Sequence, residues 1–204
     1  MSAEPDDGNP DPEEEWRLLE GSTRGDHSGF TELVRRYHRP GLAFCHQILG
    51  DYQKAEDAVQ KGFANLFQSA ARFERRARLK TLLFKIFLNL CINELAKKGE
   101  NHASFSALGD ETDGAPALRD GTSPEPGRSM DDAELAEMVR RALLRLNPRH
   151  RAALYLREYA DLSYAEIALA LSASLAEVKI WIHRGRLAVQ DLVRPYLDDG
   201  EPIR

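Results

Sequence analysis

Apolar residues recur at helical spacing along most of the chain, and no segment shows the two-residue alternation that is typical of a half-buried strand. The spacing is clear from Phe30 to Tyr37, where Asp26 stands in position to cap a helix. Pro40 and Gly41 follow, and we expect them to kink or interrupt this helix because proline lacks an N–H group. The other apolar stripes of the first half are 16–19, 44–49, 55–70 and 79–95.

The second half of the chain has the same helical character. A stripe over 135–146 ends at Asn147–Pro148, where proline forces a boundary and suits the first turn of a further helix over 149–159. Because every periodic segment is helical, we expect an all-α fold of two small helical domains joined by a flexible linker.

Two segments contain too few large apolar residues to offset the chain entropy that folding removes. The first is rich in Pro, Asp and Glu, and the second mixes Gly, Ser, Pro and acids. We therefore expect a disordered acidic tail, a helical domain, a flexible acidic linker, a second helical domain and a short tail. Their bounds are 1–12, 13–98, 99–130, 131–197 and 198–204.

The charge is distributed unevenly. The 204 residues carry a net charge of −5, yet residues 21–98 hold 14 bases and seven acids and can bind a polyanion locally. No run of about 18 apolar residues and no basic, apolar leader is present, so we expect a cytoplasmic protein without membrane insertion. Cys45 and Cys91 lie in apolar stripes and are expected to be buried free thiols.

Residues 163–186 have the pattern of a helix-turn-helix. Ser163 and Glu166 predict a capping box for a short first helix, and Ser174 is placed to cap a longer second one. Polar residues on the second helix lie off its inward face, as on a helix that reads the major groove of DNA. An ordinary helical hairpin has the same pattern. The polar residues are Glu177, Lys179, His183, Arg184 and Arg186.

A second candidate surface lies in the basic block, where Phe73 stands among bases between two predicted helices. Cations beside an aromatic ring suit single-stranded nucleic acid, whose bases stack and whose phosphates attract charge. The alternative interpretation is a solvated loop followed by the solvent-exposed face of an amphipathic helix. The bases are Arg72, Arg75, Arg76, Arg78 and Lys80, and a polar row follows at Thr81, Lys85, Asn89, Asn93 and Lys97.

The segment LGDYQKAEDAVQKGF at 49–63 resembles the region 2 helix of bacterial RNA polymerase sigma factors. A linker joins it to a C-terminal helix-turn-helix with no intervening domain, which resembles the extracytoplasmic function (ECF) class of that family. Further similar segments occur in the family's order at 30–41, 80–98, 143–171 and 177–189.

This resemblance implies a region 2-like domain at 13–98 and a region 4-like domain at 131–197. It implies that the protein binds core RNA polymerase and promoter DNA, directs promoter recognition and melting, and is controlled by an anti-sigma factor. Core polymerase would be contacted by Asp57, Gln60 and Lys61. The −10 element would be contacted by Phe73, Arg75, Arg76, Arg78, Lys80, Lys85, Asn89 and Asn93, and the −35 element by Glu177, Lys179, Ile180, Trp181, His183, Arg184 and Arg186.

The sequence departs from the family pattern at several of these places. Lys61 stands where an acid is usual, and Gly62 stands where a β-branched or apolar residue is usual. The further departures are Leu82 for a Trp, Phe87 and Leu88 for a small residue and a base, Ser172 for the turn Gly, and Ile180 and Trp181 for a small polar residue and an Arg. Apolar groups on a recognition helix can contact thymine methyl groups or a protein.

Three functions therefore stay open: a sigma factor, a sigma-like module that binds an anti-sigma factor or polymerase without productive promoter recognition, and a helix-turn-helix repressor that acts without polymerase. An enzyme is not expected. The sequence has no phosphate-binding Gly-rich loop and no His-Glu-x-x-His motif, and its six histidines are scattered, so we expect no metal site and no cofactor.

Overall fold

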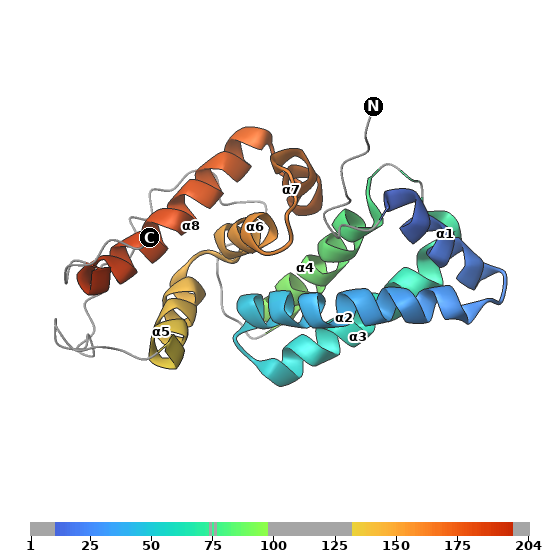
Figure 1. Cartoon of the computed structure of the whole chain (residues 1–204), viewed down its shortest axis with the longest axis horizontal. Coiled ribbons are helices and arrows are strands. Elements are labelled where there is room, and N and C mark those ends of the chain that lie inside the picture. Colours follow the sequence, from blue (N-terminus) through green and yellow to red (C-terminus); the bar gives the residue numbers. More distant parts are fainter. Residues whose placement is uncertain (1–10, 74, 76, 98–131, 198–204) are drawn as a thin grey trace, which may run out of the picture.

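The structure is a computed structural model, and it describes residues 11–73, 75, 77–97 and 132–197 (Figure 1). Over these ranges it is built of helices without a strand, which confirms the predicted fold class. The first group of helices is α1 (Pro12–Thr23), α2 (His27–Leu49), α3 (Tyr52–Ser69), the short 3₁₀ helix η1 (Ala70–Arg72) and α4 (Leu79–Lys97). The second is α5 (Asp132–Arg145), α6 (Pro148–Glu158), α7 (Tyr164–Leu171) and α8 (Leu175–Leu197).

The first group packs around α2, which contacts α1, α3 and α4. Its centre is a set of aromatic rings that meet edge to face. Phe87 of α4 is fully buried there, and its ring lies between Gly41 of α2 and Gly62 of α3. A Cβ atom on either glycine would come within 2.6 Å of the ring, so both glycines are required by close packing.

Of the two outcomes that we expected at Pro40 and Gly41, a kink or an interruption, the interruption is absent, because α2 runs through both residues from His27 to Leu49. Proline removes one hydrogen bond from the helix. Pro40 is exposed while Gly41 faces the core, so the apolar stripe continues unbroken across this point. Burial of Leu33, Phe44 and Ile48 on the two sides outweighs the missing bond.

Side-chain caps define several helix starts. The caps predicted at Asp26 and Ser163 are confirmed, and Ser163 forms the full capping box with Glu166. Gly50, with φ at +67°, ends α2. The predicted tail and linker lie outside the described residues, except that Asp11 caps α1 and Pro12 begins it. Cys45 and Cys91 are free and buried, as predicted.

The second group of helices lies alongside α2 and α4 (Figure 1). Helix α7 packs on α4, while α5 and α6 pack on α2. Tyr155 of α6 marks the contact: its ring meets that of Phe44 at 5.4 Å between centroids, and its hydroxyl donates to the Pro40 carbonyl oxygen at 3.3 Å. The two domains therefore form one continuous core in this structure.

In the part of the chain that the structure describes, no helix is long and apolar enough to cross a membrane. The same residues contain no cluster of three or more His, Cys, Asp or Glu side chains that could hold a metal ion.

Candidate nucleic-acid and protein interface

The face of α3 that carries Asp57, Gln60 and Lys61 is exposed. These residues are three and four positions apart, so the helix places them side by side. Gln60 donates to the Glu56 carboxylate at 3.3 Å, and the same Glu56 oxygen lies 3.2 Å from Nε2 of His38. The predicted set is therefore one continuous polar surface, suited to contact with another protein.

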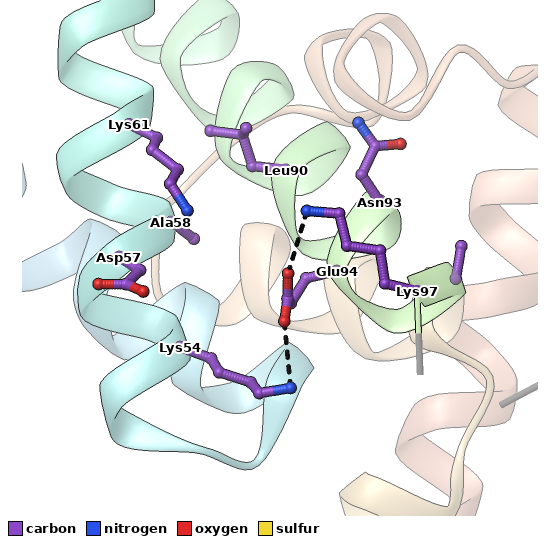
Figure 2. Close-up of a pocket in the computed structure, with 9 residues that line it drawn as sticks. Lys54, Asp57, Ala58, Lys61, Leu90, Asn93, Glu94 and Lys97 are labelled. Atoms are coloured by element: carbon purple, nitrogen blue, oxygen red, sulfur yellow. Dashed lines mark ion pairs between the residues drawn. The ribbon is translucent and has the colours of Figure 1, made fainter. Parts of the chain in front are cut away.

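A groove of about 540 Å³ lies beside this face, between α3 and α4 (Figure 2). Glu94 bridges its two walls, because its carboxylate lies 3.1 Å from Nζ of Lys54 and 3.6 Å from Nζ of Lys97. The hydrogen bond from Lys54 lowers the pKa of Glu94. Asn93 also lines this groove, together with Asp57 and Lys61, so it lies with the predicted protein-binding residues rather than with the basic loop.

Sequence reasoning missed Lys54 and Glu94. The available signal was weak. Lys54 lies three residues before Asp57 and Glu94 lies three residues before Lys97, but nothing in the sequence places the two helices together.

The basic loop between η1 and α4 is already engaged with acids of the same chain. Arg75 pairs with Glu13 at 2.9 Å and with Glu20, to which its Nε donates at 3.0 Å. Arg78 lies 3.8 Å from Glu166 of α7. Phe73 packs partly buried against the core. Burial is the main cause that lowers the pKa of Lys80, followed by the neighbouring Arg78. Arg76 lies outside the described residues.

The polar row on α4 is divided between two surroundings. Lys85 lines an open groove of about 490 Å³ whose other residues come from α7, the turn after it and the start of α8, among them Leu169 and Leu175. Asn89 is exposed. The residues predicted for the −10 element are therefore not brought together on one open surface in this structure.

The helix-turn-helix is formed by α7 and α8. Ser172 ends α7 in the left-handed conformation, with φ at +51°, where glycine is the usual residue. Ser174 and Glu177 form a second reciprocal pair at the start of α8: Glu177 Oε2 accepts from the Ser174 N–H and hydroxyl at 2.7 Å, and its own N–H donates back at 3.2 Å. The carboxylate that we expected to contact the −35 element thus caps its own helix, and these bonds lower its pKa.

Of the residues predicted for the −35 element, Lys179, Ile180 and His183 are exposed on α8. Arg186 is also exposed and pairs with Glu158 of α6 at 2.6 Å. Arg184 is half-buried.

Trp181 is placed differently from our expectation, because only 9% of it is exposed. The Arg149 guanidinium lies over its ring at 5.4 Å, and the His150 ring lies 6.1 Å away. Burial, with a smaller contribution from Arg184, lowers the pKa of His150 to about 4. In this arrangement the indole joins α6 to α8 and offers little surface to a base edge.

Family models and known proteins match both domains. The model "Sigma-70 region 2" matches residues 33–100, and "Sigma-70, region 4" matches residues 136–189. The RNA polymerase sigma-H factor of Pseudomonas aeruginosa is 29% identical over 191 residues, which cover 92% of this chain and 98% of that protein. The ECF RNA polymerase sigma factor SigW of Bacillus subtilis is 28% identical over 174 residues, 84% of this chain and 92% of that one.

Two solved structures share the fold. The sigma factor RpoE of Bartonella quintana, in complex with the anti-sigma factor NepR, superposes with a TM-score of 0.60 and 23% identity over 81% of this chain and 96% of that one. CnrH, in complex with the cytosolic domain of CnrY, has a TM-score of 0.60 and 19% identity over 92% of this chain and 99% of its own.

Proposed function

Because this chain belongs to the ECF class of the sigma-70 family, we propose that it binds core RNA polymerase and directs it to promoters, where it recognises and melts the DNA. The observation that carries this proposal is the presence of both family regions in order, with an exposed polar face on α3 in the first and an exposed polar face on α8 in the second. Sigma factors supply specificity and carry out no chemistry of their own, so no enzymatic activity is proposed.

The division of labour follows the domains. We assign residues 13–98 to the polymerase and the −10 element, residues 131–197 to the −35 element, and residues 99–130 to a linker between them. Asp57, Gln60 and Lys61 form the polymerase contact, supported by their shared exposed face.

The structural surroundings of each residue reduce the set that we propose to bind DNA. On α8, Lys179, Ile180 and His183 are exposed, and Arg184 and Arg186 can reach phosphates once they leave their present neighbours. Glu177 and Trp181 act by capping and by packing. For the −10 element, the remaining DNA-binding candidates on α4 and in the segment before it are Arg78, Lys80, Lys85 and Asn89. Phe73 packs against the core and supports the loop.

We further propose that an anti-sigma factor binds this chain and that it acts in the cytoplasm, where core polymerase works. One solved structure that shares the fold is a sigma factor in complex with an anti-sigma factor.

The test is run-off transcription with purified core polymerase, comparing the wild type with Asp57→Ala and Lys179→Ala. Asp57→Ala should weaken core binding. Lys179→Ala should leave core binding unchanged, weaken binding to a duplex with the −35 element, and reduce the slope of log affinity against log salt by about one unit. Asp191→Ala removes another exposed acid and serves as the control for Asp57→Ala.

The outcomes separate the three functions that the sequence left open. A sigma factor forms a holoenzyme and an open complex. A chain that binds polymerase without opening a promoter is a protein-interaction module, and a chain that binds duplex DNA without polymerase is a repressor. Either of the last two results would overturn the proposal.

A further inference from the structure

Helix α1 lies against the segment that joins η1 to α4, and it touches both of those helices. Three residues of α1 reach the segment from one face of the helix, at positions i, i+3 and i+7. Glu13 and Glu20 hold the Arg75 guanidinium from two sides. Between them, the buried Trp16 donates its indole N–H to the Ala77 carbonyl oxygen at 3.2 Å. Main chain and side chain of the loop are thus both fixed by α1.

A fourth residue of α1 continues this contact into the core. Glu15 is 1% exposed and accepts a hydrogen bond from the Tyr37 hydroxyl of α2. Burial raises the pKa of Glu15, while the hydrogen bond from Tyr37 and the charges of Arg78 and Lys80 lower it. The end of the loop therefore lies over a buried carboxyl group that α1 supplies.

The charges of α1 are divided by direction. Glu14, on another side of the helix, pairs with Arg36 of α2 at 2.8 Å and does not contact the loop. Arg75 uses Nε and both terminal nitrogens on Glu13 and Glu20, so in this conformation all three of its nitrogens engage carboxylates of α1.

We infer that Glu13, Trp16 and Glu20 are positioning residues, through which α1 holds the loop that presents the start of α4 to the melted −10 strand. The inference rests on the proposed function. Its physical basis is preorganisation: a loop already held in its binding conformation loses less entropy when it takes up a single strand. In this proposal Arg75 links the loop to α1 through its ion pairs and does not contact DNA.

The experiment uses holoenzyme assembled from core polymerase and the full chain. Three variants are compared with the wild type: Glu13→Gln/Glu20→Gln, Trp16→Phe, and Glu14→Gln as the matched control. Melting is followed by the fluorescence of 2-aminopurine in the −10 element, and affinity is measured separately for a forked −10 template, for a duplex with the −35 element, and for core polymerase.

The double glutamine variant should bind the forked template about three- to tenfold more weakly, the range that two partly exposed ion pairs can supply. Trp16→Phe keeps most of the ring packing, loses one hydrogen bond, and should lower the same affinity about two- to tenfold. Binding to core and to the −35 duplex should be unchanged for both, and Glu14→Gln should match the wild type throughout.

Arg75→Gln supplies the decisive comparison. If α1 acts through Arg75, this variant reproduces the loss of affinity for the forked template that the double glutamine variant shows. The triple variant Glu13→Gln/Glu20→Gln/Arg75→Gln should then show no further loss. A much larger loss for Arg75→Gln alone would mean that this arginine contacts DNA, and would overturn the inference.

Three other results would also overturn it. Tighter binding of the double variant to the forked template would mean that the acids mask Arg75. Equal losses of affinity for core polymerase, the −35 duplex and the forked −10 template would mean that the whole protein is destabilised. No loss of affinity would mean that the contacts of α1 do not contribute to binding of the −10 strand. Failure of the wild type itself to open the promoter would instead refute the proposed function.

Discussion

The ring of Phe87 is held between two glycines, and this arrangement predicts that Gly62→Ala destabilises the first domain. A new Cβ at position 62 would stand 2.5 Å from Cδ1 and Cε1 of the ring. The ring has no room to retreat, because a Cβ at Gly41 on its other side would already stand 2.6 Å away, which shows how closely that backbone approaches. The substitution therefore forces a backbone shift or a strained rotamer.

Two opposing effects set the magnitude. Replacing glycine by alanine inside a helix stabilises it by about 1 kcal/mol. Overpacking a filled core costs about 1–3 kcal/mol, and the upper part of that range applies here because the ring is confined at both edges. We expect a net loss of about 1–2 kcal/mol in the free energy of unfolding.

The assay is urea unfolding followed by circular dichroism, with a double-mutant cycle against Phe87→Leu. Leucine at position 87 lacks Cε1 and can rotate its methyl groups away from Gly62, so in the Phe87→Leu background Gly62→Ala should be neutral or stabilising by up to about 1 kcal/mol. Ala64→Gly, at an exposed position of α3, calibrates the intrinsic helix effect and should cost about 1 kcal/mol. If Gly62→Ala stabilises the wild-type chain by as much as Ala64→Gly destabilises it, the packing explanation is wrong.

Three further predictions concern the second domain. Ser172→Gly should raise the unfolding free energy by about 1 kcal/mol, measured by thermal unfolding, because only glycine adopts the left-handed conformation without strain. Stability should fall as pH drops from about 6.5 to about 4, because the unfolded chain protonates His150 before the folded one does, and His150→Gln should flatten this part of the pH profile. Tyr155→Ala removes the contacts to Phe44 and Pro40 and should increase the distance between fluorophores attached to the two domains; an unchanged distance would show that Tyr155 does not hold them together.

The helices and their caps could be predicted because the information is local. A stripe at i, i+3 and i+4 and a cap one turn away lie within a few residues, and so the starts of α2 and α7 were expected at Asp26 and Ser163. The interruption allowed for at Pro40 does not occur, for the complementary reason: a local rule counted the lost hydrogen bond, while the burial that keeps α2 continuous depends on distant helices.

The candidate site was less predictable because its partners are distant in the sequence. Arg75 and Glu20 are 55 residues apart, and Arg186 and Glu158 are 28 apart. The resemblance implied that Trp181 contacts the −35 element, and only the position of α6 shows that Arg149 and His150 cover it.

Two departures from the family pattern explain each other once the packing is known. A glycine in a helix interior is unfavourable by itself, and a phenylalanine in place of a small residue is too large for a core built around that residue. Gly62 and Phe87 lie on different helices and touch. The missing side chain at Gly62 makes room for the large ring, and the packing of the ring offsets the cost of a glycine in the helix. Neither therefore indicates a loss of the fold or of the polymerase contact. Lys61 is different, because its side chain is exposed and has no such compensation in the core. Of the departures on α3, only the reversed charge at Lys61 alters what the surface offers to a partner.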